Sequence, residues 1–372
     1  MIAAAWEIMW WKLGDVKKPG GAAHGILDRA AEYEDQRKIT EPERVRVDKA
    51  KGPDAKGAKA AQPKVAYLST WCPLSKVVVK RNIVLNVRDH APWSIWPQLP
   101  PQSNGESRGA DKPGYNPKRS FKIQVLDGSN EPVKDEDVKI FTTYEEGSGG
   151  HGHKNGDKAL PQDKQGLFYW KGKNGNPLIA KTDEQGMITI DSLVASQVSG
   201  KFLVTAGVKT DMTVRDTVQL HVRVPGLVEF GTGDYWSLTG NASTEGQNHP
   251  RNHWCTQVMK DSLTKALKRF YEWTESEEGG GKGIKLAIND MSLEWAGVFD
   301  IYGNWNLNKD HSFHRVGLSV DIDNAALKED DPKNPKEKKL TRRGQGLERF
   351  VKDSGGKMYD EGPIHFGYEK GN

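Results

Sequence analysis

The pattern of residues 317–323 constrains the fold of the last third of this chain more than any other stretch. Small or apolar residues alternate there with polar ones, which is typical of a half-buried β-strand. His314 lies in the loop that would enter this strand and Asp321 lies on it, so the two can share a metal ion. His365, far along the chain, would complete a set of two imidazoles and one carboxylate, which leaves one zinc position open for water.

This set of donor atoms indicates which metal to expect. Two neutral imidazoles and one carboxylate suit zinc better than calcium or magnesium, which prefer oxygen ligands. Asp323 lies next along the same strand face and is expected to orient a ligand histidine. The alternative is a strand whose His and Asp side chains satisfy one another in a core without a metal.

The order and spacing of these residues also resemble a known family. A His, six intervening residues and an Asp, followed far downstream by a His before an aromatic residue, is similar to a group of zinc peptidases. The group contains bacterial D-Ala-D-Ala carboxypeptidases, penicillin-insensitive murein endopeptidases and phage L-alanyl-D-glutamate endolysins, with the hedgehog domain as a relative. The resemblance covers roughly residues 234–372 and is strongest to the murein endopeptidases, because His311 precedes His314 by three residues.

The resemblance implies a zinc peptidase that hydrolyses peptide bonds next to D-amino acids in peptidoglycan, as a carboxypeptidase or an endopeptidase. It implies Zn²⁺ as the cofactor and His314, Asp321 and His365 as its ligands. His311 would contact the substrate or stabilise the oxyanion, and its alternative is a loop histidine bonded to the backbone. The hedgehog relative implies that such a site can also keep zinc while its main role is binding.

The general base is where this sequence departs from the family pattern. In the relatives an acidic residue stands three positions before the last zinc ligand, or a His stands two before it, and here these positions hold Gly362 and Pro363. The nearest carboxylates belong to Glu361 and Asp360. We therefore expect Glu361 to activate the water, with Asp360 as the alternative, and a zinc-binding domain of little activity is the rival interpretation.

The remaining sequence divides into further segments that differ in composition. Residues 1–65 are expected to form a flexible or partly helical N-terminal arm, and residues 66–115 a strand and a Pro/Trp-rich connector. Residues 116–226 contain short alternating runs separated by turn residues, which predict a β-sandwich. These runs resemble bacterial Ig-like repeats of surface proteins. The chain is thus expected to be multidomain, with an all-β Ig-like sandwich followed, in residues 227–372, by an α+β domain with a central antiparallel sheet.

Within the last segment, local patterns predict several elements. An amphipathic helix is expected where Met259, Leu263 and Phe270 recur on one face. Residues 346–355 predict a short second helix, and residues 327–339 predict a solvated charged loop.

Four other histidines are assigned no ligand role. His151 and His153 lie in a Gly-rich loop with no third ligand near in sequence, so a solvated loop is expected rather than a metal site. His249 and His253 are expected to pack or hydrogen-bond near the site, since Pro250 argues against a helical i, i+4 ligand pair.

The tryptophan and cysteine residues carry weaker signals. Trp93 and Trp96 are expected to form a packing patch at a domain edge, with a ligand platform as the alternative. Cys72 and Cys255 are expected to be two free thiols, with a disulfide as the alternative.

Composition limits the partners and the location. A net charge of +4 over 372 residues is small, and no Lys/Arg cluster is interleaved with aromatic residues, so nucleic acid is not an expected partner. No run approaches the length of a membrane-spanning helix, and the N-terminus shows no clear signal peptide. We expect a bacterial protein that acts on peptidoglycan peptides, outside the cytoplasm or on the cell wall. The alternative is a non-catalytic surface binding or adhesion protein whose C-terminal domain binds zinc without activity.

Overall fold

The computed structural model describes most of the chain after residue 113. The described residues are 82–85, 92–99, 114–153, 158–240, 249, 251–300, 303–305, 314–323, 327–360 and 364–368, without the side chains of 85, 331, 334–337 and 360. The expected N-terminal arm and Cys72 lie outside these ranges. The described residues all belong to one compact unit, Val79–Asn372.

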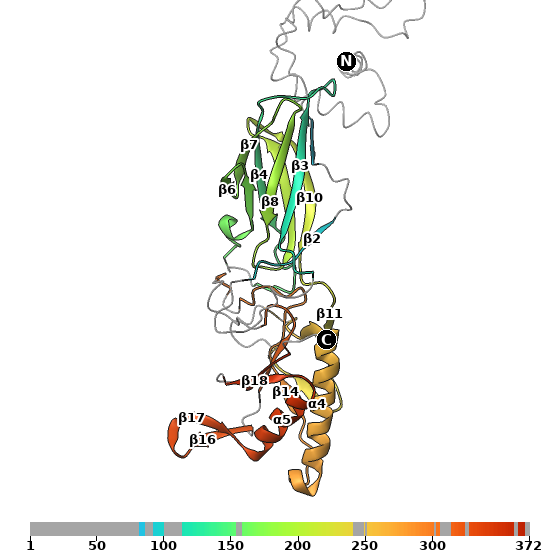
Figure 1. Ribbon diagram of the computed structural model, residues 1–372, viewed down its shortest axis with the longest axis vertical. Coiled ribbons are helices and arrows are strands. Elements are labelled where there is room, and N and C mark those ends of the chain that lie inside the picture. Colours follow the sequence, from blue (N-terminus) through green and yellow to red (C-terminus); the bar gives the residue numbers. More distant parts are fainter. Residues whose placement is uncertain are drawn as a thin grey trace, which may run out of the picture. The chain divides into compact units, whose positions relative to one another are not determined.

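Two five-stranded sheets form the first domain (Figure 1). Neighbouring strands run antiparallel except β2 and β10, which run parallel. One sheet contains, in spatial order, β1 (Asn82–Leu85), β3 (Lys118–Leu126), β8 (Met187–Val194), β5 (Leu167–Trp170) and β6 (Lys173–Gly175). The other contains β2 (Trp93–Ile95), β10 (Asp211–Val222), β9 (Gly200–Val208), β4 (Asp137–Tyr144) and β7 (Leu178–Lys181), and a 3-10 turn, η3 (Gln162–Lys164), precedes β5.

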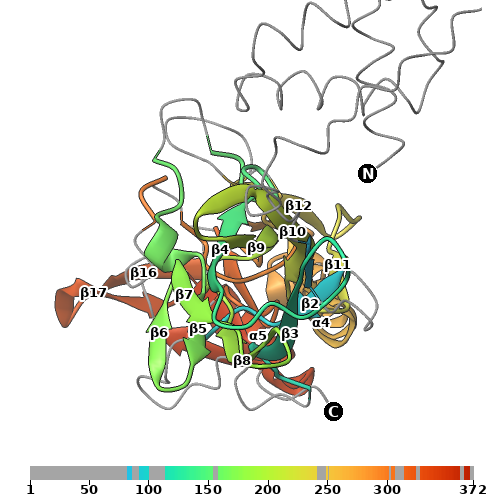
Figure 2. The ribbon, with the colours of Figure 1, turned by 90° about the horizontal axis from the view of Figure 1, so that it is seen from above.

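The alternation of apolar residues explains how the two sheets pack. Ile123 and Val125 on β3, and Val138 and Ile140 on β4, are fully buried and belong to one core cluster to which both sheets contribute. Figure 2 views this sandwich along its strands. Burying alternate residues of each strand leaves the intervening residues for solvent, as in other packed sheets. The expected β-rich, multidomain architecture is confirmed.

The sandwich begins earlier in the chain than residue 116. Strands β1 and β2, from the stretch expected to be a connector, pair with β3 and β10. Trp93 on β2 is only 1% exposed, and its ring lies 5.1 Å from that of Phe121. Trp93 is therefore a core residue rather than part of a ligand platform.

A third five-stranded sheet forms the centre of the C-terminal domain. Its spatial order is β12 (Trp236–Leu238), β14 (Leu286–Ile288), β15 (Ser319–Ile322), β19 (Ile364–Gly367) and β18 (Lys357–Asp360). All neighbours are antiparallel except β12 and β14, so the sheet is mixed rather than purely antiparallel as expected. The reason is the helix between β12 and β14, because a helical crossover returns the chain in its original direction.

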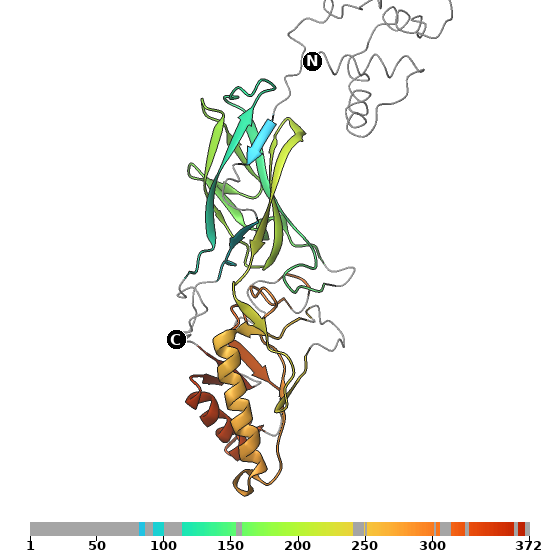
Figure 3. The ribbon, with the colours of Figure 1, turned by 90° about the vertical axis from the view of Figure 1, so that its right-hand side faces the viewer.

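Two α-helices cover this sheet among the described residues. Helix α4 (Gln257–Glu275) begins at Thr256, whose side chain accepts a hydrogen bond from the Met259 N–H, and η4 (Glu277–Gly279) follows it. The apolar face of α4 is buried as predicted. Figure 3 shows this helix, in orange, running beside the strands of the domain. Helix α5 (Arg342–Asp353) begins four residues earlier than predicted, because Thr341 caps it. Neither described helix is long and apolar enough to cross a membrane.

Two smaller two-stranded sheets complete the domain. Strand β11 (Leu227–Glu229) pairs with β13 (Trp254–Thr256). Strands β16 (Lys328–Asp331) and β17 (Asn334–Leu340) form a hairpin where a charged loop was expected. Opposite charges face each other across it, with Lys338 on Asp330 at 2.8 Å and Lys339 on Glu329 at 3.2 Å. The prediction of an irregular loop was wrong because cross-strand charge pairing, rather than apolar alternation, favours this hairpin.

The sandwich and the C-terminal domain are joined by backbone and side-chain contacts. Val198 forms an isolated β-bridge with Gly297, and the Val298 N–H donates to the Gln197 carbonyl at 2.9 Å. The Ser199 hydroxyl donates to the Ala296 carbonyl at 2.5 Å. Val298 is fully buried and belongs to the core cluster of the sandwich. Residues 296–298 thus lie within the C-terminal domain in the sequence, but they contact the sandwich in the folded chain.

The helix α4 face offers a test of the C-terminal core. We expect Phe270→Ala to lower the free energy of unfolding by about 3–5 kcal/mol, because the fully buried ring leaves a cavity. Val258→Ala on the same helix should cost less than about 0.5 kcal/mol, since Val258 is 42% exposed. Urea unfolding followed by circular dichroism measures both. Equal losses would contradict the assigned helix face.

Candidate metal centre

The structure brings the three predicted ligands together. Asp321 on β15 and His365 on β19 are directly opposite each other in the antiparallel pair, so their side chains lie on one face of the sheet. Asp321 Oδ1 lies 2.6 Å from His365 Nδ1, and Asp321 Oδ2 lies 3.2 Å from His314 Nε2. The carboxylate is thus held between two imidazoles from separate segments.

The electrostatics of this group favour an ionised carboxylate. His314, Asp321 and His365 are 2%, 5% and 3% exposed. Burial by itself raises the pKa of Asp321, but the charge and hydrogen bonds of the two histidines outweigh it and hold this pKa well below its usual value. An ionised carboxylate is the form that binds a cation.

The donor atoms fit a zinc ion. Ligand atoms of a tetrahedral zinc site are about 3.4 Å apart, given zinc–nitrogen and zinc–oxygen distances near 2.1 Å. The 3.2 Å between His314 Nε2 and Asp321 Oδ2 is close to this spacing. The 2.6 Å between Asp321 and His365 is a hydrogen-bond distance and would have to lengthen for both to bind one ion. Two nitrogens and one oxygen leave a position for water.

A buried serine fixes the loop that carries His314. The Ser292 hydroxyl donates to the His314 carbonyl at 2.5 Å and accepts the Gly317 N–H at 3.0 Å. It thereby holds both ends of the turn that precedes β15. The sequence analysis missed Ser292, since it lies outside every motif and only the fold brings it to this loop.

Ser319 takes the place that was predicted for Asp323. Its hydroxyl lies 3.4 Å from His314 Nδ1, so it can orient the ring and leave Nε2 for a metal. Ser319 precedes Asp321 by two residues and therefore shares its strand face. The Asp323 side chain is exposed, and the backbone N–H of this residue donates a hydrogen bond to the Ala287 carbonyl.

Tyr359 extends the row of side chains across the sheet. It is opposite His365 in the β18–β19 pair, and the two rings are 5.6 Å apart at an angle of 58°. Tyr359 is only half-buried, whereas the three ligand candidates are buried. The sequence analysis did not single it out.

The structure does not describe the side chains of the three residues predicted to take part in catalysis without binding the metal. His311 and Glu361 are outside the described residues. The backbone of Asp360 ends β18, opposite Ile364, and its side chain is not described. Their roles therefore stay predictions.

The other histidines divide into two groups. His253 is buried, its Nε2 lies 3.3 Å from the Ile288 carbonyl, and burial lowers its pKa, in keeping with a packing role. His151 is 1% exposed and lies near His153 and His249. The expectation of a solvated loop at His151 was wrong, because contacts with the C-terminal domain cover it.

The described cysteine is a buried thiol. Cys255 is free, and burial raises its pKa to about 12. A thiol with so high a pKa is protonated at neutral pH and is a poor nucleophile.

The turn before β15 can be tested with two glycines. Gly317 has a φ of +73°, and an added Cβ would lie 2.5 Å from a Leu227 methyl carbon and 3.1 Å from the Cys255 Cα. Gly355 has a φ of +88° with open space around it. We expect Gly355→Ala to cost about 1 kcal/mol of stability for its backbone alone, and Gly317→Ala to cost clearly more and to weaken zinc binding. Chemical unfolding and zinc titration measure this, and equal effects would contradict the packed turn.

Comparisons with known proteins identify no relative of this chain. No protein-family model and no curated protein matches the sequence. Domains 4–9 of the surface layer protein SbsC match 46% of this chain and 18% of their own, so this chain spans under a fifth of that structure, with 11% identity and a TM-score of 0.21. The ASH/PapD-like domain of human CEP192 (PapD-like domain 7) matches 39% of this chain and 82% of its own, with 11% identity and a TM-score of 0.17. Scores this low assign neither fold nor function to this chain.

Proposed function

We propose that this protein is a zinc-dependent peptidase that hydrolyses peptide bonds next to D-amino acids in peptidoglycan, as a carboxypeptidase or an endopeptidase. The observation that supports it is the convergence of His314, Asp321 and His365 on one buried face of paired strands. These residues also have the order and spacing of the peptidase family that the sequence resembles. Strands β15 and β19 thus bring together the residues that the sequence motif names, and this supports a metal site over a chance cluster.

The chain's own residues would divide the work as follows. When bound, a zinc ion would lower the pKa of its water to about 7 and polarise the scissile carbonyl. His314, Asp321 and His365 would hold the ion, with Asp321 as the anionic ligand, and Ser319 would orient His314. Glu361, or alternatively Asp360, would accept the proton of the attacking water, and His311 would contact the substrate or its oxyanion.

The β-sandwich would act as the targeting part of the protein. Its strand pattern resembles Ig-like repeats of bacterial surface proteins, which space or bind rather than catalyse. In this proposal the sandwich holds the catalytic domain against the wall, and the protein acts outside the cytoplasm. The small positive net charge of +4 agrees with an anionic surface.

A non-catalytic binding or adhesion protein is the second candidate. Gly362 and Pro363 occupy the positions at which the peptidase relatives carry their base, and this favours it. In that case the sandwich binds the partner, and the C-terminal domain is a zinc-bound scaffold. The two candidates differ in whether the wall is cut.

Zinc content and wall cleavage separate the two candidates. We expect the parent to bind zinc at the site formed by His314, Asp321 and His365. It should release peptides from purified peptidoglycan until a chelator is added. His314→Ala should lose this zinc and at least about 10³-fold in activity, since the ion supplies several kcal/mol of transition-state stabilisation. His221→Ala, on β10 of the sandwich, is the matched control and should change neither.

Wall binding by both His314→Ala and the parent, with no cleavage by either, would support the binding protein instead. Cleavage that survives complete removal of zinc would contradict the proposed catalytic role of the metal.

The base has its own test. We expect Glu361→Gln to keep its zinc and to lose about 10²–10⁴-fold in kcat, because proton transfer from the water is impaired. Asp360→Asn should leave kcat within a few fold. The opposite ranking would assign the base to Asp360, and unchanged activity in both variants would remove this pair from the mechanism.

A further inference from the structure

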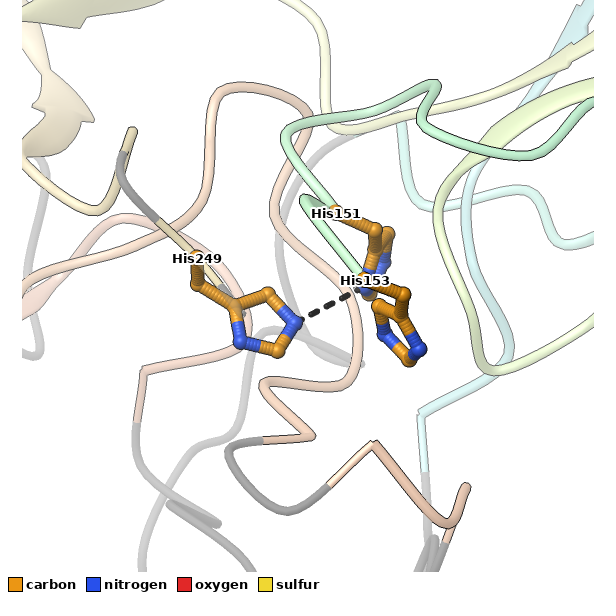
Figure 4. Close-up of side chains that lie close together, drawn as sticks. All are labelled: His151, His153 and His249. Atoms are coloured by element: carbon orange, nitrogen blue, oxygen red, sulfur yellow. Dashed lines mark hydrogen bonds between the residues drawn. The ribbon is translucent and has the colours of Figure 1, made fainter. Parts of the chain in front are cut away.

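A second group of histidines lies where the sandwich meets the C-terminal domain. His151 and His153 belong to the loop that follows β4, whereas His249 precedes β13 in the other domain. In Figure 4 the His249 ring points toward the other two, and its Nε2 is joined to His151 Nδ1 by a contact of 3.1 Å. His151 and His249 are 98 residues apart in sequence, so only the folded chain forms this group.

The geometry of the three rings suits one ion. One ligand nitrogen from each histidine lies within 4.8 Å of the others. The ring centroids are 5.1 to 5.8 Å apart, and the rings meet at angles of 61° to 84°, edge to face. Because zinc donors are about 3.4 Å apart, small side-chain rotations would complete the set.

Burial makes this arrangement unusual without a ligand. His151 and His249 are 1% and 3% exposed, and His153 is half-buried. His151 Nε2 is buried and has no hydrogen-bond partner among the described residues. A buried nitrogen left in this state calls for a ligand.

The surrounding residues hold the rings in place. The Trp305 ring stacks on His153 at 4.0 Å and 17°, and its Nε1–H donates to the Lys158 carbonyl at 2.6 Å. The Trp305 backbone N–H donates to the buried carboxylate of Asp300. Gly149 has a φ of +73°, and an added Cβ would lie 2.7 Å from the Ser199 carbonyl oxygen, so the loop is pressed against the sandwich. A site built on fixed side chains binds a metal with little reorganisation.

We propose that His151, His153 and His249 bind a second Zn²⁺ ion, which ties the sandwich loop to the C-terminal domain. The donor set is three imidazole nitrogens, which suits zinc and excludes calcium and magnesium as preferred ions. The fourth position is left for water or an external ligand. This proposal does not depend on peptidase activity.

The second site is separate from the first. The Phe299 ring lies between them, with its centroid 5.1 Å from that of His249 and 6.2 Å from that of His314. Metals that act together in one reaction are about 3.5–4 Å apart. The ion at His249 would therefore be structural with respect to the first site, and it would hold Phe299 against the ring of His314.

Metal counting on the full chain tests the proposal. The purified protein is loaded with zinc, dialysed and analysed for metal per chain. We expect two zinc ions in the parent and in the control His221→Ala, and one each in His314→Ala, His249→Ala and His153→Phe. The last variant keeps an aromatic ring that can stack on Trp305 and lacks the ligand nitrogens. A parent count of two in folded His249→Ala or His153→Phe overturns the proposal.

Stability supplies a readout that does not use activity. In the His314→Ala background, where the first site is lost, a chelator should lower the melting temperature, because an ion that binds only the folded chain stabilises it. The shift should vanish when His153→Phe is added. A chelator that leaves the melting temperature of His314→Ala unchanged overturns the proposal even if His249→Ala fails to fold. One zinc in that background without wall cleavage by the parent would support this site while contradicting the proposed peptidase.

Discussion

The C-terminal domain depends on one buried carboxylate held between two imidazoles. Asp321 is 5% exposed, and a charge removed from water in this way is tolerated only with close partners. Its partners come from the register of β15 and β19, which places His365 opposite it. The other face of β15 carries Val320 and Ile322, which pack in the core with α4. A slip of one residue would set Phe366 against the carboxylate, so core packing and the site select the same register.

Local sequence patterns predicted much of this fold and one of its two groups of clustered histidines. Alternation from residue 317 predicted β15, and the spacing of apolar residues predicted α4, because both signals arise within one element. The pairing of Asp321 with His365 followed from a family resemblance rather than from periodicity. Ser292 and the His151 cluster were missed because distant segments create them only on folding. The β16–β17 hairpin was missed because its strands lack the alternation of apolar and polar residues by which strands are predicted. Its charged residues pair only across the two strands.

The two histidine groups differ in their donor atoms and therefore in the kind of metal site that each would form. The His314 group contains a carboxylate and adjoins the half-exposed Tyr359, as a centre that receives a substrate would. The His151 group contains nitrogens alone, is enclosed by aromatic rings and draws on two domains, as a structural centre would. Phe299 contacts both. The same ring thus lies beside both groups, next to His249 at the boundary of the two domains and next to His314.

The backbone contacts at residues 296–298 bear on whether the C-terminal domain can exist without the sandwich. Val298 is packed in the sandwich core, and Gln197 of the sandwich accepts from both the Val298 N–H and the Arg315 guanidinium, the latter at 2.9 Å. Arg315 follows His314 directly, and its side chain is 2% exposed. A fragment cut after residue 226 would leave this guanidinium without its glutamine and expose Val298 to water. The C-terminal domain would therefore have to be moved into another protein together with the sandwich to keep these contacts.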